Sequence, residues 1–269
     1  MILDIFPFDL KDTFECGQCF RWNENTDGSY TGVAFGKVLN VKKAENSVVL
    51  SDNSAIWKDY FDLSTDYNKI MKELSIDDIM VEAIAKSSGI RILKQEFAET
   101  VISFIISQNN NIPRIKSIIE NLCQKFGKEL EGGYFAFPEM SKLSNLSPDD
   151  LKFLKAGYRD SYIIDAAQKI SLNSLDMDII KNAPISDARA EISKIKGVGP
   201  KVADCILLFG ASRTEVFPTD VWMKKVLTTF YGFETLTPKE INGFAEKKFG
   251  RLAGYAQQYL FNLARINKI

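Results

Sequence analysis

The spacing of apolar residues along the chain changes once. Between residues 13 and 51, apolar and polar positions alternate over short runs such as 37–43, which predicts strands of a small antiparallel sheet. Asp27 and Gly28 mark a turn between the first two of these strands. From residue 66 to the end, apolar positions recur every three or four residues, which predicts helices. The pattern therefore predicts an α+β fold, with an N-terminal antiparallel sheet followed by a two-part helical body.

We expect two structural regions. Residues 1–90 are predicted to hold the sheet and its linking helices, and residues 91–269 the helical body. Within the body, the apolar positions of 97–108 and 113–126 predict two consecutive helices. The last helix is expected to return and pack near the second half of the body. A cleft between the two halves is then the place where a ligand would bind.

A glycine-rich connection joins two predicted helices at residues 187–210. Pro200 opens the second helix, where its missing N–H leaves no hydrogen bond unmade. Gly197 and Gly199 let the backbone approach another molecule closely, and the N–H groups of a helix start favour an anion such as a phosphate. Lys201 follows in the first turn. A tight connector with a solvated lysine is the simpler interpretation, but the whole string favours binding of a phosphate backbone.

Composition limits the chemistry that is open to this chain. Its 269 residues are 45% hydrophobic, which is enough for a well-packed core, and its net charge of −1 provides no overall basic field. It contains no histidine, which excludes Ser–His and Cys–His nucleophile pairs and every His-ligated metal site. Cys16 and Cys19 form a C-x-x-C pair, but the chain lacks a second pair to complete a zinc site.

The string at 197–201, followed by Val202-Ala203-Asp204-Cys205 and Pro218-Thr219-Asp220, resembles the helix-hairpin-helix DNA glycosylase superfamily. Within it, the chain most resembles the 8-oxoguanine DNA glycosylase/lyases, through segments spread from Cys16 to Phe261. The resemblance implies a bifunctional base excision repair enzyme. It would flip 8-oxoguanine out of double-stranded DNA, cleave the N-glycosidic bond through a lysine Schiff base, and then nick the strand by β-elimination. No cofactor is required and no metal ligands are assigned.

Two residues match the catalytic positions of that family. Lys201 matches the nucleophile, a neutral amine that attacks C1′ of the sugar. Asp220 matches the catalytic aspartate, whose carboxylate stabilises the positive charge that develops on the sugar. Asp220 is also predicted to cap the following helix, and the two roles are compatible.

Four residues match the family's pocket for the flipped base. Gly17 matches the residue whose backbone carbonyl accepts a hydrogen bond from N7–H, a group that 8-oxoguanine carries and guanine lacks. Gln257 matches the glutamine that reads the Watson–Crick edge. Phe261 and Cys205 match the two walls that enclose the base. Taken singly, Phe261 and Cys205 would more simply be core residues.

The resemblance also assigns residues that contact DNA outside the pocket. Asn109 matches the residue that fills the gap left in the duplex, and Tyr158 matches the wedge beside the opposite base. Arg114 and Arg159 match the contacts to the unpaired cytosine. Trp222 stands where many relatives carry a histidine near the 5′-phosphate, so this contact differs from theirs.

Two alternatives remain open. One is a glycosylase of the same superfamily that acts on another lesion, against which Gly17, Gln257 and Cys205 argue. The other is a non-catalytic module that binds the DNA backbone, against which Lys201 and Asp220 argue. The sequence has no apolar run of membrane-spanning length, and its first residues lack the basic part of a signal peptide. We expect an intracellular, DNA-associated monomer, cytoplasmic if the source is prokaryotic.

Overall fold

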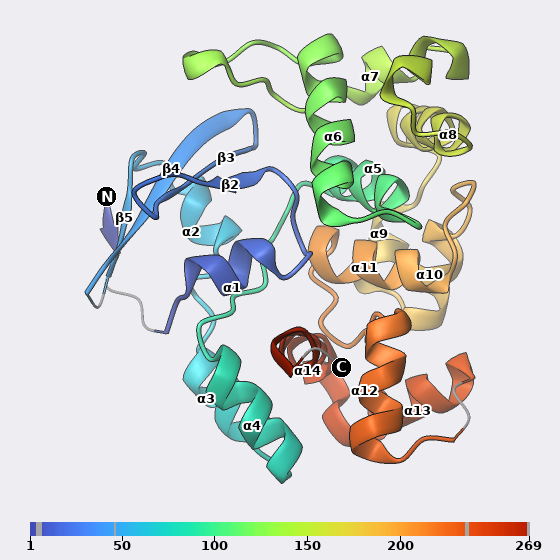
Figure 1. Ribbon diagram of the computed structural model, residues 1–269. Coiled ribbons are helices and arrows are strands. Elements are labelled where there is room, and N and C mark those ends of the chain that lie inside the picture. The colour runs from blue at the N-terminus through green and yellow to red at the C-terminus, as the bar shows by residue number, and fades with distance from the viewer. Residues whose placement is uncertain (4–6, 46, 235–236, 268–269) are drawn as a thin grey trace.

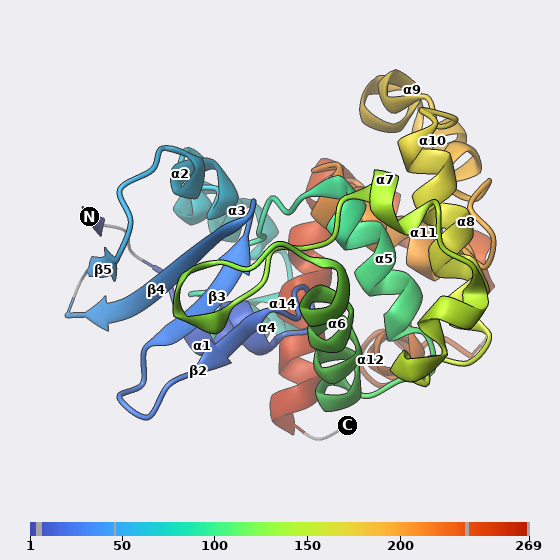
Figure 2. The same cartoon turned by 90° about the horizontal axis from the view of Figure 1, so that it is seen from above.

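The computed structural model describes residues 1–3, 7–45, 47–234 and 237–267. An antiparallel five-stranded sheet lies on one side of the molecule and the helical body on the other (Figures 1 and 2). The strand order is β1-β5-β4-β3-β2. The strands are β1 (Ile2–Leu3), β2 (Trp22–Glu24), β3 (Tyr30–Ala34), β4 (Lys37–Ala44) and β5 (Ser47–Leu50). The α+β fold class predicted from the sequence is confirmed.

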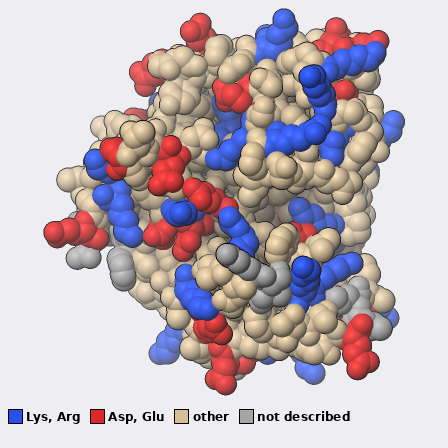
Figure 3. All heavy atoms as spheres, viewed as in Figure 1, with Lys and Arg blue, Asp and Glu red and all other residues tan. Residues whose placement is uncertain are grey.

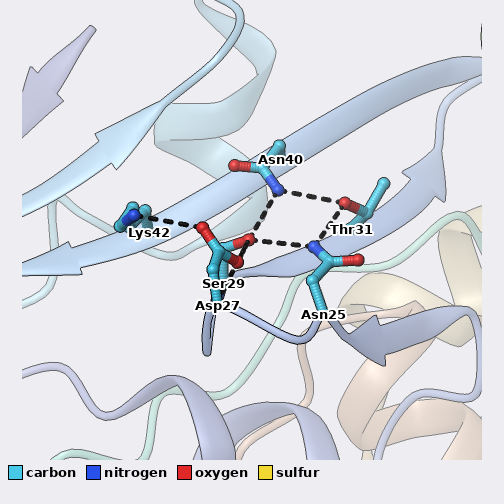
Figure 4. Close-up of polar contacts among 6 residues, drawn as sticks. All are labelled: Asn25, Asp27, Ser29, Thr31, Asn40 and Lys42. Carbon is cyan, nitrogen blue, oxygen red and sulfur yellow. Dashed lines mark hydrogen bonds and ion pairs between the residues drawn. The ribbon is translucent and has the colours of Figure 1, made fainter.

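A polar network fixes the predicted turn between β2 and β3 (Figure 4). The side-chain amide of Asn25 donates to Ser29 Oγ and Thr31 Oγ1, both at 2.9 Å. The amide of Asn40, on β4, donates to the same two hydroxyls at 3.0 Å. Asp27 Oδ1 accepts from the Ser29 backbone N–H at 3.1 Å. Because one network joins the turn to β4, it also holds the register in which Thr31 and Asn40 lie opposite each other.

The predicted strand region begins at residue 13, but in the structure β2 begins only at Trp22. Residues 10–15 form helix α1 (Leu10–Glu15), whose N-cap Asp9 accepts from the Asp12 backbone N–H at 2.9 Å. Phe14 is 1% exposed and stacks on Trp22, with 4.2 Å between the ring centroids. A helix of six residues is too short to show a clear helical period, and packing against the sheet stabilises it.

The helical body follows in a continuous series of helices. α14 lies near the centre of the molecule and packs against α4 and α12, while α5 packs against α6, α8 and α11 (Figures 1 and 2). The helices are α2 (Ile56–Tyr60), α3 (Tyr67–Leu74), α4 (Asp78–Ser87), α5 (Phe97–Ser107), α6 (Ile112–Phe126), α7 (Met140–Leu143), α8 (Arg159–Ser171), α9 (Met177–Asn182), α10 (Ile185–Ile192), α11 (Pro200–Gly210), α12 (Val221–Tyr231), α13 (Pro238–Phe249) and α14 (Ala253–Asn267), with short 3₁₀ turns η1 (Glu131–Gly133), η2 (Pro148–Leu154) and η3 (Gly250–Leu252).

The buried apolar residues of the described ranges form two clusters. One lies under the sheet and includes Phe14, Trp22 and Trp57. The other is the core of the helical body, and it also contains side chains of α3 and α4, such as Ile70 and Met80. The division of the chain after residue 90 stays a prediction.

The helix-hairpin-helix predicted at 187–210 is present as α10 and α11, although α10 begins two residues earlier than expected. Gly197 has a φ of +80°, and a Cβ at this position would lie 2.1 Å from the ring of Tyr162. Only glycine fits there. The Asp165 carboxylate accepts from the Lys196 backbone N–H at 2.7 Å, which fixes the hairpin to α8.

Candidate active site

A cavity of about 70 Å³ brings together all the residues that the resemblance assigned to catalysis and base binding. Its walls come from the loop after α1, from α5, α11 and α14, and from the segment that precedes α12, all of which meet near the centre of the molecule (Figure 1). The lining residues are Cys16, Gly17, Phe104, Lys201, Cys205, Phe209, Pro218, Asp220, Gln257, Gln258 and Phe261.

Lys201 lies in the first turn of α11, as predicted, and is half-buried. Its Nζ is 5.4 Å from the centroid of the Phe104 ring, a cation–π distance. No carboxylate of the described ranges forms an ion pair with it. Lys201 lines the cavity, where its side chain interacts with the thiol of Cys205.

Cys205 lies one turn further along α11 and is 3% exposed. Burial raises the pKa of its thiol to about 11, and the nearby Lys201 offsets this only in part. The thiol is neutral at physiological pH, so it is a weakly polar wall of the cavity and not a nucleophile.

Asp220 is the N-cap of α12, as its place in the sequence predicted. Its Oδ1 accepts a hydrogen bond of 2.9 Å from the backbone N–H of Met223. The residue is half-buried and lines the cavity together with Lys201. A carboxylate can accept more than one hydrogen bond, so capping leaves acceptor capacity for a ligand.

Gly17 follows α1 with a φ of +85°, a conformation that glycine adopts readily. The neighbouring Gln18 is fully buried and holds this segment in place. Its Nε2 donates to the carbonyls of Thr13 and Arg91, both at 2.8 Å, and its Oε1 accepts from the Leu93 backbone N–H at 2.9 Å. Gly17 thus lies in a rigidly supported loop between α1 and β2.

Gln257 and Phe261 lie one turn apart on α14 and both face the cavity. Gln257 is 5% exposed, and its Oε1 accepts from Gln258 Nε2 at 2.6 Å. Sequence reasoning did not identify Cys16 and Gln258, which also line this wall. No sequence signal could have found Gln258, since consecutive residues on a helix normally point in different directions.

A partly buried ion pair joins α10 to α11, the helix that carries Lys201. Arg189 Nε and Nη2 donate to the two carboxylate oxygens of Asp204 at 2.6 and 3.2 Å, and Nη2 also donates to Asn242 Oδ1 at 3.2 Å. Burial raises the pKa of Asp204, and Arg189 counteracts this effect. The pair joins α10, α11 and α13, so the role of Asp204 is structural.

The residues assigned to the opposite strand form a group at the N-terminal ends of α6 and α8. Asn109 has a φ of +48°, and its Nδ2 donates to Tyr158 Oη at 3.4 Å. Tyr158 is 49% exposed, as a wedge residue requires. Arg159 differs from the others, because it is 7% exposed and donates to the backbone carbonyls of Gln108 and Ala156. For Arg159 to contact a base, some of these bonds would have to open.

Arg114 and Trp222 are both exposed to solvent. Arg114 Nη2 donates to the Lys155 carbonyl at 3.0 Å. Trp222 is 43% exposed, and Lys225 Nζ lies 5.2 Å from its ring centroid. Basic side chains extend across the upper part of the face in Figure 3 and around its hollowed centre, whereas acidic side chains gather toward the sheet. Positive charge that could attract a phosphate backbone is therefore concentrated on part of this face, although the net charge of the chain is −1.

The comparisons with known proteins identify the family of the chain. Residues 102–251 match the family model of the HhH-GPD superfamily of base excision DNA repair proteins, and residues 2–101 match that of the 8-oxoguanine DNA glycosylase N-terminal domain. The chain belongs to the HhH-GPD superfamily of base excision DNA repair proteins, with an N-terminal region of the 8-oxoguanine glycosylase type. The resemblance drawn from the sequence motifs is confirmed.

Individual relatives extend the match over almost the whole chain. The N-glycosylase/DNA lyase of Saccharomyces cerevisiae is 30% identical over 94% of this chain and 82% of its own length. The 8-oxoguanine glycosylase/lyase of Clostridium acetobutylicum, in complex with DNA that has cytosine opposite 8-oxoguanine, superposes with a TM-score of 0.93 at 43% identity. MBOgg1 bound to a low-affinity DNA ligand gives 0.93 at 45% identity. Both cover 97% of this chain and 93% of the other.

None of the helices in the described part of the chain is long and apolar enough to span a membrane.

Proposed function

We propose that the protein is a DNA glycosylase with an associated lyase activity that excises 8-oxoguanine from double-stranded DNA. The observation that carries this proposal is the single cavity in which Lys201, Asp220, Gly17 and Gln257 meet. The relatives named N-glycosylase/DNA lyase and 8-oxoguanine glycosylase/lyase support the same activity.

The chemistry follows from Lys201 and Asp220, which lie at the N-terminal ends of α11 and α12. The Lys201 amine attacks C1′ of the damaged nucleotide, and the C1′–N9 bond breaks with its electron pair leaving on the base, which takes up a proton. The Asp220 carboxylate stabilises the positive charge that develops on the sugar. Ring opening gives a Schiff base between Lys201 and C1′. Loss of a C2′ proton then expels the 3′-phosphate by β-elimination, and hydrolysis frees the lysine.

Other residues that line the cavity select the base. The Gly17 carbonyl accepts from N7–H of the lesion and faces the N7 lone pair of normal guanine, which it repels. Gln257 reads the Watson–Crick edge. Phe261 and Cys205 enclose the flipped base from its two faces.

The DNA itself is held outside the cavity. The backbone N–H groups of the hairpin at Gly197 and Gly199 bind a phosphate of the damaged strand. Asn109 and Tyr158 occupy the space that the flipped nucleotide leaves, and Arg114 contacts the unpaired base. Exposed Trp222 contacts the backbone next to the lesion. These contacts position the lesion over Lys201.

The test is borohydride trapping on duplexes that carry 8-oxoguanine, with undamaged and abasic duplexes as controls. A covalent complex on lesion DNA and free 8-oxoguanine in the supernatant are expected. A protein that binds the lesion duplex but forms no covalent complex and releases no base would be a backbone-binding module. Release of another damaged base in preference to 8-oxoguanine, on a panel of lesion duplexes, would contradict the substrate assignment.

A further inference from the structure

A series of buried hydrogen bonds connects the two groups proposed to recognise the base. Gln258 Nε2 donates to Gln257 Oε1 at 2.6 Å, and the Cys16 thiol donates to Gln258 Oε1 at 3.3 Å. Gln258 is 4% exposed and Cys16 is 2% exposed, and both line the cavity. Cys16 directly precedes Gly17. Gly17 is proposed to sense N7–H, and Gln257 is proposed to read the Watson–Crick edge. The side chains of Cys16 and Gln258 link these two residues, and no role has been assigned to either side chain.

The surroundings fix the direction of these hydrogen bonds. Two acceptors lie within reach of the Cys16 thiol, the Thr13 carbonyl at 3.4 Å and Gln258 Oε1 at 3.3 Å. The Thr13 carbonyl also accepts a bond of 2.8 Å from Gln18 Nε2, whereas Gln258 Oε1 accepts from the Cys16 thiol alone among the described residues. Burial raises the pKa of Cys16 to about 11, so the thiol keeps its hydrogen at neutral pH. Gln258 must then present its NH₂ group to Gln257.

This direction decides how Gln257 meets a ligand. A glutamine amide has two orientations that exchange its donor and its acceptor. With Oε1 accepting from Gln258, Nε2 of Gln257 donates to no group within the described ranges and is left for a ligand. The edge of guanine presents the O6 acceptor beside the N1–H donor, whereas adenine presents the N6 donor beside the N1 acceptor. The two amide orientations therefore match the two purines.

We propose that Gln258, held by the Cys16 thiol, is a positioning residue that locks the Gln257 amide in the orientation that accepts a guanine-type edge and rejects an adenine-type edge. The inference rests on the proposed function of the cavity and adds the origin of one part of its specificity. Without Gln258, the Gln257 amide can turn over and pair with either purine.

The experiment compares single-turnover excision of 8-oxoguanine and 8-oxoadenine placed opposite the same base. Both lesions carry N7–H and the C8 oxygen, so the Gly17 carbonyl cannot tell them apart. Each rate is divided by the rate at which the same variant cleaves abasic-site DNA, which contains no base to read. Wild type should favour 8-oxoguanine, and Gln258→Met should lower this preference roughly tenfold or more, the worth of one mismatched bidentate contact.

Two substitutions at the other end of the chain of hydrogen bonds provide the matched pair. Cys16→Ala removes the thiol donor and should lower the preference in the same direction as Gln258→Met. Cys16→Ser keeps a hydroxyl donor and should retain most of the preference. This pair keeps the test decisive even if Gln258→Met does not fold.

The outcomes separate the two levels of the proposal. A wild-type protein that releases no 8-oxoguanine overturns the proposed function and this inference with it. A wild-type protein that prefers 8-oxoguanine, with the same preference in Gln258→Met and Cys16→Ala, overturns only the positioning role.

Discussion

Asp220 Oδ1 accepts a hydrogen bond of 2.9 Å from the backbone N–H of Met223. This bond makes Asp220 the cap of α12, while the same side chain lines the cavity beside Lys201. One carboxylate thus serves both the local structure and the proposed chemistry. The two roles can be separated experimentally, because an amide can replace the carboxylate in the first role but not in the second.

Asp220→Asn should lower the rate of base release roughly 100-fold or more, the usual effect of losing a group that stabilises transition-state charge. Asparagine caps helices about as well as aspartate, so the free energy of unfolding should change by less than about 0.5 kcal/mol. Single-turnover excision and urea unfolding measure the two effects. A large loss of stability would show that the carboxylate is mainly structural.

Lys201→Gln should abolish both base release and borohydride trapping, because an amide nitrogen is not a nucleophile and forms no Schiff base. Binding to a lesion duplex should be largely retained, since the hairpin glycines and the rest of the cavity are unchanged. A gel-shift assay beside the trapping assay gives both readings. Trapping at the wild-type level by this variant would mean that another amine is the nucleophile.

The Gly17 carbonyl should make excision depend on the N7 hydrogen. A lesion analogue that keeps the C8 oxygen but has no N7–H should be excised poorly, since an unpaired buried acceptor costs roughly 1–3 kcal/mol before repulsion is counted. Gln257→Ala should instead weaken the binding of 8-oxoguanine and guanine alike, because their Watson–Crick edges are the same. Equal excision of the lesion and its N7-blocked analogue by wild type would rule out the Gly17 carbonyl as the discriminating contact.

Glu99 should make a contribution to the stability of the protein that falls as the pH rises from 5 to 8. Burial raises the pKa of Glu99 from 4.5 to about 7, and Arg21, with Nη1 at 3.6 Å, offsets this only in part. Between these values the folded state binds more protons than the unfolded state, so the free energy of unfolding decreases with pH. Relative to Glu99→Gln, which does not titrate, wild type should lose about 1–3 kcal/mol across this range in urea unfolding. An identical pH dependence in the two proteins would contradict the raised pKa.

The sequence by itself determined the features that depend on near neighbours. The turn at Asp27-Gly28 and the cap at Asp220 follow from hydrogen bonds within a few residues, and the positive φ at 197 favours glycine there. Motif resemblance, which records such local strings, also assigned six of the residues that line the cavity, namely Gly17, Lys201, Cys205, Asp220, Gln257 and Phe261. It could do so because the superfamily's fold carries those strings to the same place.

Only the tertiary structure decided how distant side chains are used. It buried Arg159 against backbone carbonyls and formed α1 where strand was expected. It also joined Cys16 to Gln258, which is 242 positions further along the chain. The free energy of each arrangement depends on burial and on partners that are far apart in the sequence. No local pattern contains that information, because it arises only when the helices and the sheet pack together.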